Sequence, residues 1–522
     1  MNVKNYNIFF HLHTVSGIII SALLYVIFFA GSFSFFRDDI NNWERNQGAL
    51  QKESEVVNDE ILLNYDEALN HVARQYNLYS SDVWFRQSHI ERNVSVSVTP
   101  AKDTLVAKQS KVPGFFYLDS KNYSISNYTE QYQLGEFLYR LHFFTQIPYP
   151  YGYHLAGFVA LFFLFAIVTG VLVHWKKIVS NFYVFRPKAK LKTIWTDAHT
   201  ALGILGVPFQ FVLAVTGAFF MIKGLLLFPG ISVLYDGNAN KLYQDFGYSE
   251  VPIAYNALKL EKTYSINDYV EQTEKRWEGF HATSVYIRNY GDTSMEVKVG
   301  GELLYKDQLS SSGHVVYKVE TGEEIAVKDP LKETTYTDVV KNLLYRLHFG
   351  DYGGYGLRVV SFILGIITCF VIISGVLIWL VAREKKSIPE KKKRFNRRLV
   401  NVYLAVCLSM YPVTALAFIA VKLNSMAGQA YIYKFYFLTW LGMSIFFILK
   451  NDDYKTNRIT LFLGSVIGFL IPFVNGAVTG NWFWIAYQKD LFSVFFIDAF
   501  WMVLSIITFL VWMKIRRKGA KL

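Results

Sequence analysis

Long apolar stretches, separated by short polar breaks, dominate the pattern along this chain. A helix needs about 20 apolar residues to cross a bilayer. Eight stretches are that long, and they cover roughly residues 14–36, 155–175, 200–228, 358–382, 399–421, 431–449, 459–477 and 491–513. Charged residues, Gly, Pro or Asn lie in the breaks, where the helices are expected to end. The pattern predicts a mainly α-helical, polytopic membrane protein with about eight transmembrane helices.

Two long polar regions interrupt these spans, and the first covers about residues 37–137. Apolar residues recur at helical spacing near Ile61–Tyr76. Strands are predicted at Val83–Phe85 and in the alternating segment Val94–Val98. Asp119–Asn122 follows an aromatic run and predicts a turn. We expect this region to fold as a small α+β unit.

The second polar region, about residues 229–340, repeats the order of elements in the first, so we expect a second small α+β unit here. It predicts a helix near Ile266–Arg276, strands at Ser284–Arg288 and Met295–Val299, and a hairpin over His314–Ile325 with its turn at Glu320–Glu323.

The same six residues, Leu-Tyr-Arg-Leu-His-Phe, occur twice, as Leu138–Phe143 and as Leu344–Phe349. Each copy leads into a long apolar stretch. The repeat indicates an internal duplication of the unit span, outer region, span. One copy covers about residues 7–180 and the other about residues 193–385. The last four spans, residues 399–513, contain no histidine, and the sequence assigns them no role.

The repeated segments contain His142 and His348, which the sequence places at the outer ends of spans two and four. Because they are equivalent in the duplication, one haem b between them is the simplest arrangement. Arg140 and Arg346 precede them by two residues and are candidates to pair with a haem propionate. The alternative is an interfacial His-Arg pair that contacts lipid headgroups.

A second histidine pair opens spans one and three, where His13 and His199 are each followed four residues later by glycine, Gly17 and Gly203. Residues four apart share a helix face. A porphyrin extends sideways from its axial nitrogen, and glycine leaves room for it. The sequence thus predicts a second bis-histidine haem at the inner ends of these spans. The alternative is a small-residue helix-packing face.

His174, at the inner end of span two, is a third candidate ligand on the inner side. Its counterpart in the second copy is Trp379, allowing a one-residue slip, so the duplication does not select it. The choice among His13, His174 and His199 stays open at this point. Ionisable residues within spans are costly and are read as functional.

Composition and charge agree with a membrane protein. Of 522 residues, 52% are hydrophobic and 18% are charged. The loop 176–196 has six basic residues and no acid, and the loop 383–398 has nine basic residues against two acids. The positive-inside rule places both loops and both termini in the cytoplasm and the two polar regions outside. The net charge of +12 follows from these loops, which argues against nucleic-acid binding.

These residues resemble the PepSY-associated transmembrane family over about residues 7–385. The resemblance rests on His-x-x-x-Gly at spans one and three, Leu-His before spans two and four, and two outer domains that each end in an expected hairpin. The segments Gly170–His174, Phe182–Pro187 and Asp197–His199 resemble its iron-regulated branch. That branch includes di-haem ferric-siderophore reductases of the bacterial inner membrane.

The resemblance implies a multi-pass inner-membrane oxidoreductase with a duplicated four-helix core that holds two haems b, and with two periplasmic PepSY-like domains. Six segments are expected: the first transmembrane helix (1–36), outer domain one (37–137), helices two and three with a basic loop (138–228), outer domain two (229–340), helix four (341–385) and a C-terminal four-helix bundle (386–522).

The function implied is electron transfer across the membrane to a ferric siderophore, whose Fe³⁺ is reduced to Fe²⁺ for release. No Walker, Rossmann or ferredoxin-type pattern is visible, so a cytoplasmic partner or the quinol pool is expected to donate the electron. Two alternatives stay open. One is a membrane-anchored module that binds peptides or proteins, and the other is haem handling without redox turnover. The sequence identifies no catalytic residue.

Overall fold

The protein forms two compact units, each of which is described by itself. The computed structural model describes residues 3–46, 63–87, 93–109, 114–183, 186, 189, 191–303, 311–332 and 335–519. The membrane unit combines Met1–Gly48, Gln133–Phe228 and Leu347–Leu522, and the second unit combines Ala49–Tyr132 and Pro229–Arg346.

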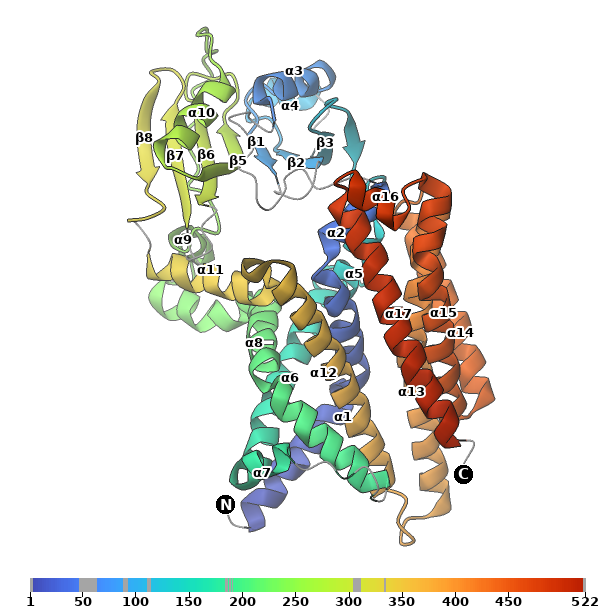
Figure 1. Ribbon diagram of the computed structural model, residues 1–522. Helices are drawn as coiled ribbons and strands as arrows, with labels where there is room; N and C mark the ends of the chain where they lie inside the picture. Colours follow the sequence, from blue (N-terminus) through green and yellow to red (C-terminus); the bar gives the residue numbers. More distant parts are fainter. Residues whose placement is uncertain are drawn as a thin grey trace. The chain divides into compact units, whose positions relative to one another are not determined.

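The membrane unit contains the long apolar helices (Figure 1). Within the described residues, eight helices are long and apolar enough to cross a membrane, which confirms the eight predicted spans. They are α1 (Val3–Ser34), α6 (Tyr151–His174), α8 (Leu191–Leu234), α12 (Gly354–Ala382), α13 (Glu390–Leu423), α14 (Gln429–Lys450), α15 (Asp453–Thr479) and α17 (Phe492–Gly519).

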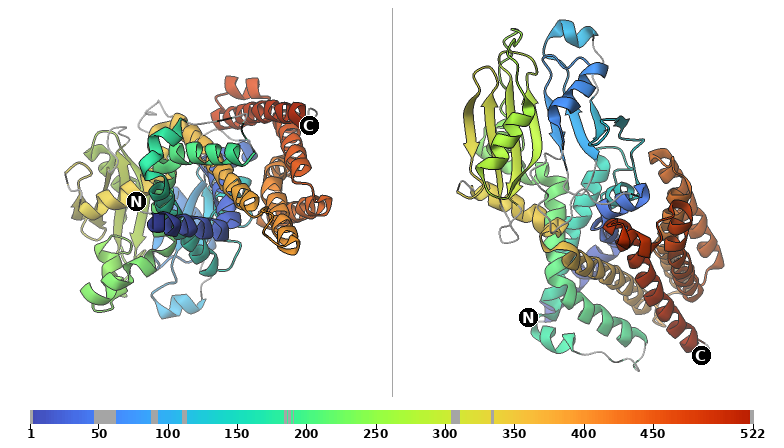
Figure 2. Two further views of the ribbon diagram at one scale, coloured as in Figure 1. Left: turned by 90° about the horizontal axis from the view of Figure 1, so that it is seen from below. Right: turned by 45° about the horizontal axis from the view of Figure 1, so that its top comes forward.

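These spans form two groups inside the membrane unit. Helix α1 packs against α6 and α12, while α13, α14, α15 and α17 pack among themselves (Figure 2). Small residues allow close approach: a Cβ added at Gly365 of α12 would lie 2.2 Å from the Oγ of Ser32 in α1. The described residues of this unit also form four short α-helices and two 3₁₀ helices: α2 (Arg37–Arg45), α5 (Leu134–Leu141), η1 (Trp175–Lys177), α7 (Ile178–Phe182), η2 (Asp351–Gly353) and α16 (Phe483–Gln488).

The second unit is built on one antiparallel sheet, to which both polar regions contribute. In its described residues the order is β4-β3-β2-β1-β5-β6-β7-β8. The first region supplies β1 (Val83–Arg86), β2 (Asn93–Val98), β3 (Phe115–Asp119) and β4 (Ile125–Asn127). The second supplies β5 (Phe280–Arg288), β6 (Glu296–Leu303), β7 (Ser312–Lys318) and β8 (Glu323–Lys328). The two expected α+β units therefore share a sheet through the pairing of β1 with β5.

Helices α3 (Tyr65–Gln75) and α10 (Ile266–Arg276) pack on one face of this sheet and close its core. Side chains alternate along β1, so Val83 and Phe85 are buried while Trp84 and Arg86 are exposed. Remaining helices of this unit are α4 (Thr104–Gln109), α9 (Ala239–Asp245) and most of α11 (Tyr336–Phe349). The sequence predicted α3, α10 and the hairpin of β7 and β8 close to their observed positions.

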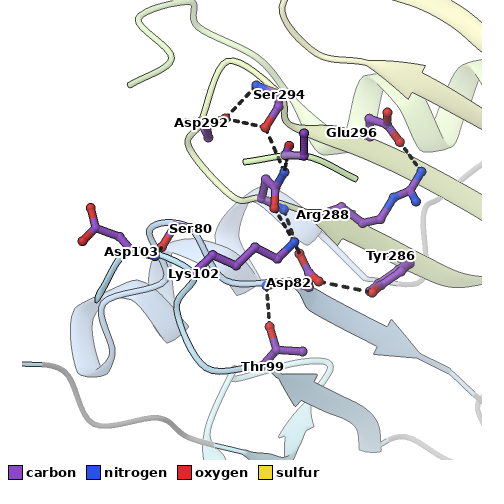
Figure 3. A network of polar contacts seen from close by, with 12 residues as sticks. Ser80, Asp82, Thr99, Lys102, Asp103, Tyr286, Arg288, Asp292, Ser294 and Glu296 are labelled. Carbon is purple, nitrogen blue, oxygen red and sulfur yellow. Dashed lines mark hydrogen bonds and ion pairs between the residues drawn. The ribbon is translucent and has the colours of Figure 1, made fainter. Parts of the chain in front are cut away.

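A polar network ties the two halves of the sheet together beside β1 and β5 (Figure 3). Asp82, from the first region, accepts hydrogen bonds from Lys102 Nζ at 3.0 Å and from the backbone N–H of Asn289 at 2.9 Å. Arg288 forms an ion pair with Glu296 one strand away. The first and second polar regions therefore fold against each other as one body.

Candidate cofactor sites

Two histidines, His142 and His348, meet near the C-terminal end of α1. Their ring centres lie 6.5 Å apart. The Nδ1 of His142 hydrogen-bonds the carbonyl oxygen of Tyr139, and the Nδ1 of His348 hydrogen-bonds the Oγ1 of Thr216 at 2.7 Å. Both rings therefore use Nδ1 for a protein oxygen and leave Nε2 for a ligand.

Neither histidine lies in a spanning helix, which differs from the sequence prediction. His142 is the C-cap of the short helix α5, and His348 lies in α11. Pro148 and Pro150 separate His142 from α6, and the left-handed Gly350 (φ 63°) ends α11 before α12 begins. Proline and left-handed glycine end helices, so each histidine stands on a separate segment ahead of its span.

A cavity of about 110 Å³ adjoins both rings. The rings lie opposite small residues: a Cβ built on Gly31 of α1 would be 3.8 Å from the Cβ of His142, and one on Gly217 of α8 would be 4.0 Å from the Cε1 of His348. Apart from the two histidines the lining is mainly apolar and aromatic, and includes Leu24, Phe28, Phe163, Phe209, Leu213, Phe220 and Met221.

Burial lowers the pKa of His142 to about 4 and that of His348 to about 3. Both groups lie outside the spanning helices. At neutral pH the two imidazoles are therefore uncharged, which is the form that binds a metal.

A second histidine pair lies at the opposite end of α1. The rings of His13 in α1 and His199 in α8 have their centres 6.2 Å apart. The Nδ1 of His13 hydrogen-bonds the carbonyl oxygen of Ala166 at 2.8 Å. The Nδ1 of His199 hydrogen-bonds the carbonyl oxygen of Val371 at 3.0 Å. A protein oxygen again holds Nδ1 in each ring.

The spacing of both pairs suits one metal ion between two imidazoles. A metal–nitrogen bond is about 2 Å long, and each nitrogen lies about 1 Å from its ring centre. Two imidazoles on opposite sides of one metal ion therefore have ring centres about 6 Å apart. A hydrogen bond from the other ring nitrogen to a carbonyl fixes the tautomer of a ligating histidine. Among the described residues no group of three or more His, Cys, Asp or Glu could hold a bare metal ion. A haem iron needs only two axial protein ligands.

Comparison with known protein families adds an independent observation. The model of the PepSY-associated TM region matches residues 10–382, most of the chain. The protein belongs to this family. Four candidate ligands, His13, His142, His199 and His348, lie inside the matched region, and the four C-terminal spans lie outside it. A search of curated proteins finds no match.

In this PepSY-associated protein, the glycines closest to the His13–His199 pair are not those that the sequence suggested. A Cβ on Gly17 would meet nothing within 4 Å, and one on Gly203 would meet only Val371 at 4.0 Å. Instead, Cβ atoms on Gly170 and Gly375 would lie 3.0 Å from the Cε1 of His13 and 3.2 Å from the Cε1 of His199. Gly170 and Gly375 lie 205 residues apart, the same offset that relates His174 to Trp379. This shared offset was the signal in the sequence that could have identified the two glycines.

His174 lies at the end of α6, close enough to influence His13 and His199 electrostatically. The ring contact in this group, however, joins His13 to His199. The His13–His199 pairing is therefore the one with the spacing expected for two axial ligands, and His174 is a neighbour of that pair.

The two candidate arginines are paired with carboxylates. Arg140 Nε donates to Glu136 at 2.5 Å, and Glu136 also accepts from Arg37 at 2.8 Å. Arg346 belongs to the other unit, where its Nη2 lies 3.5 Å from Glu302. Each guanidinium thus has an acidic partner with which a propionate would compete.

Proposed function

We propose that this protein transfers electrons across the membrane through two haems b, one held by His13 and His199 and the other by His142 and His348. The observation that carries the proposal is the repeated geometry. Two imidazole pairs have ring centres about 6 Å apart, and all four Nδ1 atoms bond protein oxygens. Packing alone does not require four histidines to share that arrangement.

The separation of the pairs along the helices supports transfer across the bilayer. Gly31 lies beside His142 and comes 18 residues after His13 on α1, and Gly217 lies beside His348 and comes 18 residues after His199 on α8. At 1.5 Å per residue this is about 27 Å, close to the hydrocarbon thickness of about 30 Å. The two sites would then lie near opposite faces of the membrane.

Bound haem would supply a one-electron Fe³⁺/Fe²⁺ couple at each site. The protein residues supply the neutral imidazoles, fix their orientation through Nδ1, and surround the His142–His348 cavity with apolar side chains. An apolar lining excludes water and is one of the means by which a protein tunes a haem potential. Because two histidines would hold the iron at each site, the bound group would favour electron transfer over oxygen binding.

We further propose a ferric siderophore as the acceptor outside the bacterial inner membrane, with a cytoplasmic reductant or quinol as the donor. Each Fe³⁺ takes one electron and becomes Fe²⁺, which hard oxygen chelators bind more weakly. With the cell interior negative, one electron moving outward is favoured by about 2.3 kcal/mol per 100 mV. Support comes from the family match and from the basic loops that orient the spans.

The deciding experiment is an absorption spectrum of the purified full-length protein, with the haem content measured per chain. We expect dithionite-reducible b-type bands at two haems per chain and anaerobic oxidation of the reduced protein by ferric siderophores, with Fe²⁺ captured by a ferrous chelator. A colourless protein after growth with ample haem supply would overturn the proposal in favour of a binding module. Ready loss of haem to an apo-acceptor, with no ferric reduction, would favour haem handling.

A further inference from the structure

The C-terminal bundle, which lies outside the family match, packs against the short helix α2. Trp43 of α2 is fully buried, and its indole N–H donates to Asp498 Oδ1 of α17 at 2.8 Å. The ring of Phe418 in α13 lies 5.3 Å from the Trp43 ring. Asn475 of α15 donates to the other oxygen of Asp498 at 2.8 Å. Three spans of the bundle therefore converge on one tryptophan.

Lys422 of α13 completes the surroundings of Trp43. Its Nζ lies 4.0 Å from the centre of the indole ring and donates to the backbone carbonyl oxygen of Trp43. Lys422 is 4% exposed, and Asp498 is fully buried. Burying a lysine and an aspartate in a helical bundle is costly. Apolar packing would hold α13 and α17 together, so these two buried ionisable side chains call for another explanation.

Helix α2 is in turn joined to α5 by polar contacts. Arg37 donates to Glu136 at 2.8 Å, and the backbone N–H of Leu134 donates to Glu44 at 2.7 Å. The backbone N–H of Glu136 donates to Asn41 at 3.2 Å. A Cβ on Gly135 would lie 2.3 Å from the carbonyl oxygen of Arg37, so the two helices touch with no room for a side chain.

Helix α5 ends at His142, the candidate axial ligand. From Leu134 to His142 there are two helical turns, so a displacement of α5 moves the imidazole directly. The bundle also contacts α5 itself, because the ring of Phe137 lies 4.7 Å from that of Tyr436 in α14. A continuous set of contacts therefore links the C-terminal bundle to the histidine through α2 and α5.

We propose that Asp498 and Lys422 are positioning residues for His142, and that the C-terminal bundle serves to hold the α2–α5 segment so that the outer haem is ligated in one geometry. The inference rests on the proposed haem function. Buried polar groups specify one register where apolar contacts allow several. Trp43 is the residue through which both side chains act, since its indole N–H donates to Asp498 and its carbonyl oxygen accepts from Lys422.

The test uses the full-length, haem-loaded protein and the variants Trp43→Phe, Asp498→Ala and Asp498→Asn. Trp43→Phe replaces the indole by a phenyl ring and so removes the N–H that donates to Asp498. The matched control is Trp512→Phe, because Trp512 comes 14 residues after Asp498 on α17 and its ring packs on that of Phe462, with ring centres 4.8 Å apart, inside the same bundle. The readouts are the haem content per chain and the low-spin electron paramagnetic resonance signal of each haem. The His142–His348 signal is assigned by its absence in His348→Ala.

We expect Trp43→Phe and Asp498→Ala to shift the signal of the His142–His348 haem or to lower the haem content from two toward one per chain, with the His13–His199 signal unchanged. Asp498→Asn retains an acceptor oxygen and should restore the wild-type signal. Trp512→Phe should match the wild type. Unchanged signals in every variant, or equal loss of both haems, would refute the positioning role. A wild-type protein without haem would instead refute the proposed function on which it rests.

Discussion

At the scale of single residues, each candidate ligand depends on a protein oxygen that holds its ring. Backbone carbonyls of Ala166 and Val371 hold His13 and His199, and Thr216 holds His348. Loss of such a contact to the second ring nitrogen typically lowers the metal affinity 10–100-fold. Substitution of a ligand should therefore remove one site and leave the other intact.

His348→Ala should lower the haem content from two to one per chain and stop the reduction of ferric siderophores, because the His142–His348 site loses one of two axial ligands. Haem is counted by its pyridine adduct. His71→Ala is the control, since His71 stacks on Tyr123 in the other unit. Retention of both haems and full activity in His348→Ala would exclude this pairing.

Gly170→Val should weaken the His13–His199 site, because even a Cβ there would come within 3.0 Å of the His13 ring. We expect loss of about one haem per chain, with the His142–His348 signal retained. Gly442→Val, at a span glycine with nothing within 4 Å, is the matched control. Equal haem content in Gly170→Val and Gly442→Val would show that Gly170 does not clear space for the ring.

The sequence singled out Gly17 and Gly203 beside the histidines, whereas the glycines that the structure places closest to the two rings lie on neighbouring helices, and the reason is physical. Gly17 and Gly203 were chosen because a helix places residues four apart on one face. The space beside His13 is instead left by Gly170 of α6, and that beside His199 by Gly375 of α12. No periodicity within one helix reveals which residue of a neighbouring helix it will meet.

At the scale of elements, one buried ion pair joins α2 to α12. Arg358 Nη1 donates to Asp39 Oδ2 at 3.0 Å, and Asp39 is fully buried. Tyr355 and Ser493 donate to the other oxygen of Asp39 at 2.6 and 2.9 Å. The carboxylate therefore connects α2 with both α12 and α17, and its charge is balanced by Arg358.

Arg358→Met should destabilise the membrane unit by about 3–5 kcal/mol, because it leaves the buried charge of Asp39 without a cation. Thermal unfolding in detergent, followed by tryptophan fluorescence, measures the loss. The double variant Asp39→Asn with Arg358→Met removes both charges and should recover most of the stability. A single variant as stable as the wild type would show that the pair is dispensable.

Elements were predictable where a local pattern encodes them. The eight spans follow from apolar runs, and α10 matches its predicted bounds because its apolar residues recur at helical spacing. The sequence placed His142 and His348 at the outer ends of spans two and four, and the structure gives each a separate helix ahead of its span. The apolar residues of these helices merge with those of α6 and α12, and the break depends on Pro150 and Gly350.

At the scale of the whole molecule, two chain segments far apart in sequence complete one sheet. The alternation within each polar region predicted its strands, but no local pattern states that β1 meets β5. Edge strands offer unpaired N–H and C=O groups to any partner. Which edges pair is determined by the common core, in which Phe85 and Val285 are both fully buried.

Phe85→Ala should therefore destabilise both halves of the sheet together, by about 3–5 kcal/mol. Hydrogen exchange should show protection lost in β1–β3 and in β5–β7 to the same degree. Trp84→Ala is the matched control, since Trp84 is 39% exposed on the opposite face and its loss should cost much less. Protection lost only in β1–β3 would mean that the halves unfold independently.

The pairing of β1 with β5 also constrains how the protein is made. β1 ends at residue 86 and β5 begins at residue 280, so 193 residues separate the partners. At 5–20 residues per second, the ribosome needs about 10–40 s to synthesise that interval. During this delay the edge of β1 that will pair with β5 has no partner strand, while helices α6 and α8 are still being inserted. A chaperone that holds the first half, or slow aggregation in its absence, is the expected cost of a sheet whose halves emerge so far apart in time.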